Sequence, residues 1–241
     1  MEPEDYVVAI RREGSLLAEA ADRSSLQAPV AACPGWTVAD LVWHVGEVHD
    51  FWRRVVGQRA ADRAEVKRSL IRPPEGELVA WYRAGLEHLA DVLAAADPAT
   101  RVWTWAPQKD AGWVRRRMAQ ETAVHRVDAG VAAGTATPVE PDLAVDGIDE
   151  FFQFFAADKA EGAAPLDGSV HLHATDTDGE WLVTGAGDQL QVTSGHAKGD
   201  AAARATASDL LLLLWRRDHG TVEVHGDRAV LDRLIAHTDL D

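Results

Sequence analysis

The sequence predicts an α+β protein of two domains, an N-terminal four-helix bundle and a small C-terminal α+β domain with an antiparallel sheet. Up to about residue 136, apolar residues recur at the three- and four-residue spacing of amphipathic helices. Further on, short segments alternate apolar and polar residues, as half-buried strands do. The stretch GTATPVEPD at 134–142 has the composition of a linker. We therefore expect domains at 1–136 and 137–241.

The helix that follows the turn signal CPGW is the best defined of the first domain. Thr37 is a good N-cap, Asp40 falls in the first turn and Gly57 ends the helix. Its buried stripe consists of Val38, Leu41, Val42, Val45, Val48, Trp52, Val55 and Val56. Similar periodicity predicts further helices at about 5–22, 77–96 and 112–133. Four helices of this length favour a bundle.

The second domain is expected to combine strands with short helices. A helix of about 142–159 lies at the junction, and the sequence does not assign it to either half. Strands are expected at 169–175, 180–186, 189–195, 201–207 and 221–227, with DTDG as a hairpin turn between the first two. A buried helix capped by Ser208 and a last helix from Asp227 to about His237 complete the domain.

Composition narrows the classes of function. The chain has 39 acidic and 24 basic residues and a formal charge of -15, which disfavours nucleic acid as a partner. The basic run Arg115 to Arg117 is interpreted as a solvated helix face with one arginine pointing inward. The longest apolar run is too short to span a bilayer, so no membrane partner is expected.

Cysteine usage and the N-terminal residues point to the cytoplasm. Cys33 is the only cysteine, which excludes an internal disulfide and fits a reducing compartment. The first ten residues, MEPEDYVVAI, lack the basic and apolar regions of a signal peptide. We interpret Cys33 as a packing residue, because the sequence shows no base near it.

The segment AQETAVHRVDAG carries the first sign of chemistry. Glu121 and His125 are four residues apart, so a helix places them one above the other on the same face. Imidazole and carboxylate are good ligands for zinc and similar ions, and catalytic zinc sites commonly use three protein ligands. The third ligand must come from another helix, and His44, His49 and His88 are all candidates. Helical periodicity does not choose among them.

Several segments in order resemble one known family. CPGWTVADLVWHVGEVHDFW followed by ETAVHRVDAG, and then VHLHATDTDGEWLVTG, ASDLLLLLWRR and VEVHGDRAVLDRL, are similar to the mycothiol-dependent maleylpyruvate isomerase family. This family is a branch of the DinB-like four-helix metalloproteins. The resemblance covers nearly the whole chain. It implies a DinB-like bundle and a sterol-carrier-like C-terminal domain.

The resemblance also implies a site and a reaction. It places a divalent metal, typically zinc, on His44, Glu121 and His125, with His49 as a neighbour. It implies mycothiol or a related thiol as cosubstrate, and a cis–trans isomerase or S-transferase acting on a small electrophile such as maleylpyruvate. Two other hypotheses stay open. One is a non-catalytic metal-binding protein whose ligand set is closed by His49 or His88, and the other is a metal-dependent hydrolase that needs no thiol.

Interpretations of the surrounding residues are also open at this stage. Asp128 either accepts a hydrogen bond from a ligand imidazole or pairs with an arginine at the surface. Trp103 or Trp105 is a candidate wall of the site. His171 and His173 share one face of a strand and are interpreted as solvated. A dicarboxylate substrate would need an arginine clamp, for which the candidates are Arg53, Arg54, Arg115, Arg116, Arg117, Arg126 and Arg204.

Overall fold

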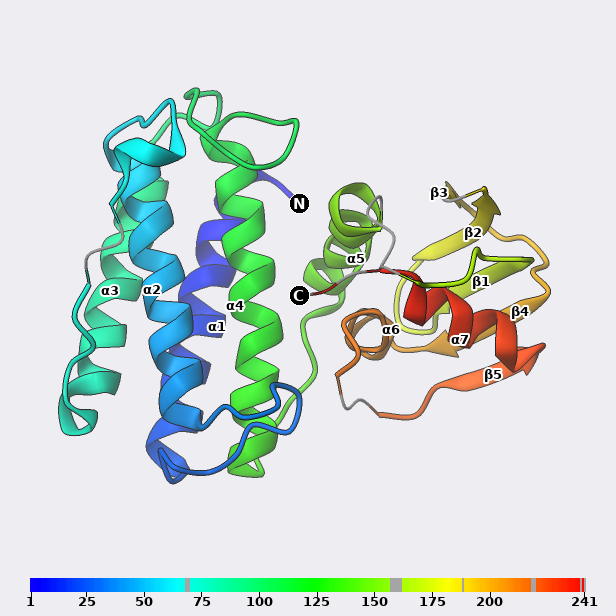
Figure 1. Ribbon diagram of the computed structural model, residues 1–241, viewed down its shortest axis with the longest axis horizontal. Coiled ribbons are helices and arrows are strands. Elements are labelled where there is room, and N and C mark those ends of the chain that lie inside the picture. The colour runs from blue at the N-terminus through cyan, green and yellow to red at the C-terminus, as the bar shows by residue number, and fades with distance from the viewer. Residues whose placement is uncertain (68–69, 157–161, 188, 218–219, 239, 241) are drawn as a thin grey trace. The chain divides into compact units, whose positions relative to one another are not determined.

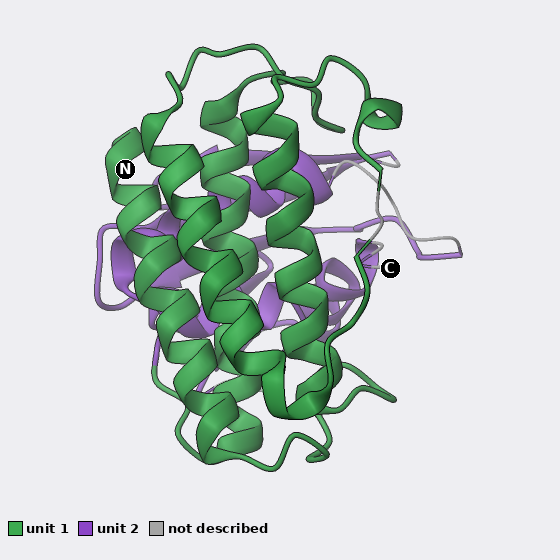
Figure 2. Ribbon diagram, turned by 90° about the vertical axis from the view of Figure 1, so that its left-hand side faces the viewer, with its two compact units in different colours: residues 1–137 green, residues 138–241 purple. Residues whose placement is uncertain are grey.

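The computed structural model describes residues 1–67, 70–156, 162–187, 189–217, 220–238 and 240. The chain divides into two compact units, residues 1–137 and 138–241, which have different colours in Figure 2. Within the described residues, the first unit contains four α-helices, and the second contains three α-helices and a five-stranded sheet. The predicted α+β class is therefore confirmed.

The first unit is built from four long helices that pack on one another. They are α1 (Pro3–Arg23), α2 (Val38–Gly57), α3 (Glu75–Ala95) and α4 (Ala111–Ala133), with a short 3-10 turn, η1 (Arg63–Glu65), between α2 and α3. Helix α1 packs on α3 and α4, and α2 packs on the same two helices. Figure 1 shows α2 and α4 side by side and running in opposite directions, so the early turns of α2 face the later half of α4.

The start of α2 is fixed by local hydrogen bonds. The Thr37 hydroxyl accepts from the Asp40 amide at 3.3 Å, and the Asp40 carboxylate accepts from the Thr37 amide at 3.0 Å. This reciprocal capping box satisfies amides that have no partner inside the helix. The predicted N-cap and the predicted end at Gly57 are both confirmed.

The turn before α2 has a defined geometry. The Trp36 amide donates to the Cys33 carbonyl at 3.0 Å, and Gly35 has a φ of 84°. Proline at the second position and a positive-φ glycine at the third are typical of a type II turn. The turn is fixed on the unit because Cys33 and Trp36 pack against its hydrophobic core.

The second unit is centred on a mixed sheet. Its strands are β1 (Ser169–Ala174), β2 (Glu180–Ala186), β3 (Gln189–Ser194), β4 (Ala201–Ala205) and β5 (Glu223–Gly226), in the order β3-β2-β1-β4-β5. The expectation of an antiparallel sheet is wrong for one pair, because β1 and β4 are parallel. Residues 195–200 run back to the other end of the sheet, so that β4 begins beside the start of β1. The alternation of apolar and polar residues within a strand does not show whether such a crossover follows it.

Three helices accompany the sheet in this unit. They are α5 (Pro141–Glu150), α6 (Ala207–Leu214) and α7 (Arg228–His237), and a π-helical turn, η2 (Phe151–Phe155), follows α5 directly. Helices α6 and α7 pack on β1 and β4 (Figure 1). Helix α5 packs on α6, which assigns the junction helix to the second unit. Its predicted extension over 157–159 lies outside the described residues.

Of the two helix caps predicted for this unit, one is confirmed and one is wrong. Asp227 caps α7 as predicted, since its carboxylate accepts from the Ala229 amide at 2.9 Å. Ser208 was expected to cap α6, but the cap is Thr206, whose hydroxyl accepts from the Asp209 amide at 3.1 Å. The Ser208 hydroxyl instead accepts from the Val139 amide at 2.9 Å, a tertiary contact. Among the described helices, none is long and apolar enough to cross a bilayer.

Candidate metal centre

Three of the side chains singled out in the sequence lie together between α2 and α4. His44 Nε2 is 3.3 Å from Glu121 Oε1, and His125 Nε2 is 3.5 Å from the same oxygen. The rings of His44 and His125 meet edge to face, with centroids 5.3 Å apart. One donor atom of each residue therefore lies within 4.8 Å of the other two.

These separations fit a small divalent ion. Zinc bonds of 2.0–2.1 Å to nitrogen and oxygen at tetrahedral angles place neighbouring donors about 3.3–3.4 Å apart. The two measured separations from Glu121 Oε1 are 3.3 and 3.5 Å. The donor set, two imidazoles and one carboxylate, is the one that zinc accepts in catalytic sites. The residues present thus fit the metal that the sequence resemblance implies.

Asp128 fixes the orientation of one imidazole. Its Oδ2 lies 2.9 Å from His125 Nδ1, and its side chain is 1% exposed. A proton on Nδ1 leaves the lone pair of neutral His125 on Nε2, which faces Glu121. Two electron-rich atoms so placed need a proton or a cation between them. The hydrogen-bonding interpretation of Asp128 is therefore confirmed and the surface interpretation is wrong.

Arg117 holds the other oxygen of the glutamate. Its Nη2 donates to Glu121 Oε2 at 2.8 Å from one helical turn away. Burial raises the pKa of Glu121, but the hydrogen bonds from His125 and His44 and the charge of Arg117 outweigh it and hold this pKa well below its usual range. Glu121 is thus kept as a carboxylate with Oε1 directed at the two histidines.

The pKa of His125 is shifted in the opposite direction to that of Glu121. Burial lowers its pKa, but hydrogen bonds to Asp128, Cys33 and Glu121 outweigh burial and raise the pKa well above its ordinary value. Without a metal, a proton on His125 gives the ring a positive charge that faces the carboxylates of Asp128 and Glu121. A divalent cation would displace that proton, as metal binding to a protonated ligand must.

An aromatic ring and a thiol from the CPGW turn border the site. Trp36 lies 4.8 Å from the ring of His44 and 6.5 Å from that of His125, centroid to centroid. Cys33 Sγ is 3.9 Å from Asp128 Oδ2. Cys33, His125 and Asp128 form a second group with donors close enough for a metal, on the Nδ1 side of the His125 ring. The thiol is therefore near a base, which the sequence did not show.

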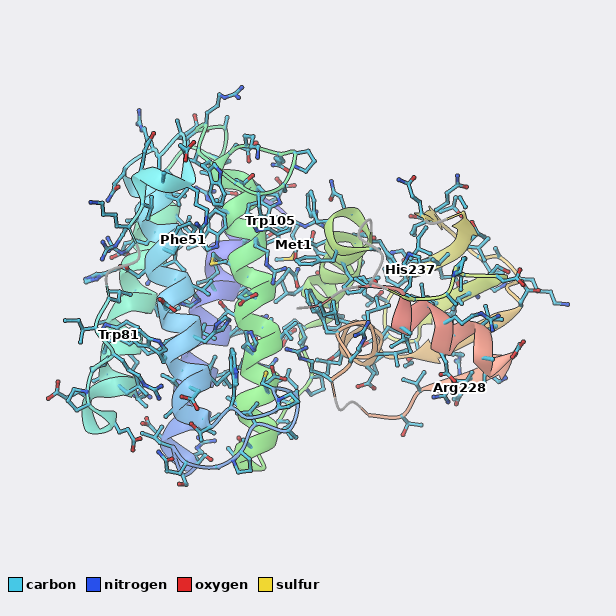
Figure 3. All side chains as sticks on the ribbon, viewed as in Figure 1. Met1, Phe51, Trp81, Trp105, Arg228 and His237 are labelled. Carbon is cyan, nitrogen blue, oxygen red and sulfur yellow. The ribbon has the colours of Figure 1, made fainter. Side chains whose placement is uncertain are left out.

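Trp103 and Trp105, the candidate wall of the site, pack on other tryptophans. Trp103 stacks on Trp52 with centroids 5.7 Å apart, and Trp105 meets Trp113 edge to face at 4.9 Å. Trp105 lies toward the end of the helical unit where α4 begins (Figure 3). The CPGW turn is at the other end, where α2 begins. The packing of this turn on α4 is a tertiary contact, so no sequence signal within the turn could have identified Trp36.

The two other histidine candidates lie apart from the cluster. His49 is buried, and its Nε2 is 2.9 Å from the Thr122 hydroxyl, which itself donates to the Met118 carbonyl. The hydroxyl has one proton, so His49 Nε2–H must be the donor to it and has no lone pair for a metal. His88 is exposed on α3. Among the described residues, neither belongs to a group of donors close enough for a metal.

The interpretation of Arg115 to Arg117 as a solvated face with one inward arginine is wrong in one respect, because two of the three point inward. Arg115 and Arg117 are buried. Arg115 donates to the Leu93 and Ala96 carbonyls at the end of α3, which have no partner inside that helix. Arg126 is also buried and pairs with Glu13 on α1 at 2.6 Å. These contacts give Arg115 and Arg126 structural roles within the helical unit.

The fold and the cluster together define a class, a two-domain α+β protein with a candidate metal centre in its helical domain. The profile of the mycothiol maleylpyruvate isomerase N-terminal domain matches residues 7–130, and that of the MDMPI C-terminal domain matches residues 142–233. The chain belongs to the mycothiol maleylpyruvate isomerase family. The suspected resemblance is thereby confirmed.

Comparison with solved structures supports the same fold. A crystal structure of the mycothiol-dependent maleylpyruvate isomerase has a TM-score of 0.63 and 12% identity, with 93% of both chains covered. A histidine-to-alanine mutant of that enzyme has a TM-score of 0.62 and 11% identity, with 92% of this chain and 93% of the other covered. No curated protein sequence matches.

Proposed function

We propose that this protein is a thiol-dependent cis–trans isomerase with a divalent metal ion, zinc, held by His44, Glu121 and His125. The cosubstrate is mycothiol or a related low-molecular-weight thiol, and the substrate is a small electrophile such as maleylpyruvate. Membership of the family supports the reaction class. The observation that carries the metal assignment is the convergence of both Nε2 atoms on Glu121 Oε1.

Each residue of the centre has a distinct task. His44 and His125 present imidazole nitrogens to the ion, Glu121 presents one oxygen, and Asp128 and Arg117 hold two of these ligands in place. When bound there, zinc would lower the pKa of a coordinating thiol and so supply the thiolate, which is the nucleophilic form. Three protein ligands leave one tetrahedral position for that thiol.

Exposure indicates how a thiol reaches the centre. The His44 side chain is 35% exposed, whereas that of His125 is 10% exposed. The centre is therefore accessible on the α2 side, beside Trp36. The Trp36 ring beside His44 offers an apolar surface to a substrate.

The reaction needs no oxidant or reductant. The thiolate forms a carbon–sulfur bond with one carbon of the cis double bond, and the electron pair moves into the adjacent carbonyl as an enolate. Rotation follows about what is then a single bond. Collapse of the enolate restores the double bond in the trans form and expels the thiolate, so the thiol is regenerated.

The test uses the full-length protein with zinc and a panel of low-molecular-weight thiols. We expect isomerisation of maleylpyruvate that depends on thiol, and loss of both the bound zinc and the activity in His44→Ala. His88→Ala is the matched control, because it removes an exposed histidine of the same domain. Absence of activity with every thiol, in protein shown to be metal-loaded, would contradict the proposal. Turnover without thiol would instead favour a hydrolase.

A further inference from the structure

We propose a second metal site in the C-terminal unit, formed by His171, His173, Glu180 and His196 and selective for zinc or another divalent ion that favours imidazole. One donor atom of each of these residues lies within 4.8 Å of the other three. This site is independent of the proposed isomerase centre, which contains none of these residues.

Sheet register brings the first three side chains together. His171 and His173 are two residues apart on β1, so they lie on the same face of the sheet. Glu180 on β2 is the direct antiparallel partner of His173, which places it on that face as well. The alternate residues Val170 and Leu172 are fully buried on the opposite side. Strand pairing alone therefore presents two imidazoles and a carboxylate side by side.

The fourth residue comes from the crossover between β3 and β4. His196 follows Gly195, whose φ is 118°, a conformation that favours glycine. Three residues later, a Cβ on Gly199 would lie 2.8 Å from the His171 amide nitrogen and 3.1 Å from the Ser169 carbonyl oxygen. The crossover can thus lie directly against β1 only with glycine at 199. This close approach holds the segment that follows His196 alongside β1, and the His196 ring lies next to that of His171.

The donor atoms surround a common point. Glu180 Oε1 lies 2.5 Å from His173 Nδ1 and 3.1 Å from His196 Nδ1, and Glu180 Oε2 lies 3.9 Å from His171 Nε2. The rings of His171 and His196 meet edge to face, with centroids 5.1 Å apart. Hydrogen bonds to Glu180 explain the positions of His173 and His196 but not that of His171.

His171 supplies the independent sign of a ligand. Its side chain is 7% exposed, and its Nε2 is buried with no hydrogen-bond partner among the described residues. An unsatisfied buried nitrogen is costly, and few occur in native proteins. This nitrogen points toward the Glu180 carboxylate from beyond hydrogen-bond distance. A cation between the two satisfies both.

The donor set indicates the metal and its role. Three imidazoles and one carboxylate suit zinc, nickel or copper better than magnesium or calcium, which prefer oxygen ligands. Four protein ligands fill a tetrahedral zinc site, which is typical of structural rather than catalytic zinc. The ion would tie the exposed end of the crossover at His196 to β1 and β2, and would thereby stabilise the sheet.

The experiment measures zinc stoichiometry in the full-length protein by equilibrium dialysis and elemental analysis. We expect two zinc ions per chain in the wild type, one in His44→Ala, one in His196→Ala and none in the double variant. His196 is exposed, so its replacement should not disturb folding. His225→Ala, which removes an exposed histidine of β5, is the matched control and should keep both ions.

Thermal stability gives a second readout that does not depend on activity. In the His44→Ala background, zinc should raise the midpoint of unfolding, and the added His196→Ala or His173→Ala change should abolish this rise. Zinc bound to the wild type that is lost entirely in His44→Ala, or retained in full by both His196→Ala and His173→Ala, would overturn the second site. A third outcome is a wild type with one zinc ion that is kept in His44→Ala and lost in His196→Ala. This outcome would support the second site and would contradict the proposed isomerase centre.

Discussion

Arg117 and Glu121 form an ion pair of 2.8 Å one helical turn apart, and the other carboxylate oxygen of Glu121 faces His44 and His125. The two carboxylate oxygens therefore have separate partners. Arg117 is 6% exposed, so the pair is shielded from water and keeps its orientation. The geometry of the candidate centre depends on this arginine as well as on the ligands.

Replacing Arg117 should weaken metal binding without removing a ligand. In Arg117→Met, Glu121 loses the contact that orients its carboxylate, and we expect zinc affinity to fall about tenfold or more, as for other residues that support metal ligands. Competition with a chromophoric chelator measures this affinity. Arg116→Met is the control, because it changes the neighbouring, partly exposed arginine. Equal affinity in the two variants would show that Arg117 does not support Glu121.

The contact between His125 and Asp128 leads to a second prediction. Asp128→Ala removes the acceptor at Nδ1, so His125 loses its fixed tautomer, and we expect zinc affinity to fall about 10- to 100-fold. Asp128→Asn keeps an oxygen acceptor and should lose less. The same chelator competition applies to both variants.

Cys33→Ala is the control that separates the two possible groups of ligands. Cys33 contributes to the group on the Nδ1 side of His125 but not to the proposed centre. The variant should therefore bind zinc as the wild type does. Loss of zinc in Cys33→Ala would place the ion between Cys33, His125 and Asp128 instead.

The buried pair between Glu13 on α1 and Arg126 on α4 should contribute strongly to folding. Both side chains are nearly inaccessible, with 1% and 4% exposure. Arg126→Met leaves a buried carboxylate without its closest cation, and we expect a loss of about 3 kcal/mol in the free energy of unfolding. Urea denaturation measures it. The control is Arg23→Met, whose pair with Glu19 is exposed and should contribute less than about 1 kcal/mol.

Local spacing explains what the sequence could predict. Glu121 and His125 are one helical turn apart, so their shared face followed from the helix itself. The caps Thr37 and Asp227 depend on amides two or three residues away, and both were predicted correctly. Helix periodicity could not choose between His44 and His49, since both lie at the edge of the same stripe. The choice came from the family resemblance.

Tertiary contacts explain what the sequence could not predict. The run Arg115 to Arg117 was expected to have one inward arginine, and the burial of Arg115 could not be predicted because its partners are carbonyls of another helix. Trp36 was missed because a turn can pack on the unit in many ways. His171 and His173 were interpreted as solvated because the residues that complete their cluster, Glu180 and His196, come from another strand and a crossover. In each case the deciding partner is distant in sequence, and residue type alone does not reveal it.

The last prediction concerns the pH dependence of stability and the buried His49. The pKa of His49 is lowered from the ordinary 6.5 to about 4, mainly by burial; the carboxylate of Glu121 opposes this shift, and the charges of His125 and His44 act in the same direction as burial. Between pH 6.5 and 4 the unfolded chain takes up a proton on this residue and the folded chain does not. Acidification through this window therefore favours unfolding, by about 3 kcal/mol in total from this group.

His49→Gln removes the titration and keeps a donor for the Thr122 hydroxyl. Urea denaturation at several pH values, with a chelator present, gives the difference in the free energy of unfolding between wild type and variant. We expect this difference to shift in favour of the variant as the pH falls from 6.5 to 4, and to stay constant above pH 7.5. His88→Gln, which replaces an exposed histidine of α3, is the control and should show no such trend. Parallel curves for wild type and His49→Gln would mean that His49 is protonated in the folded state, or is reached by water.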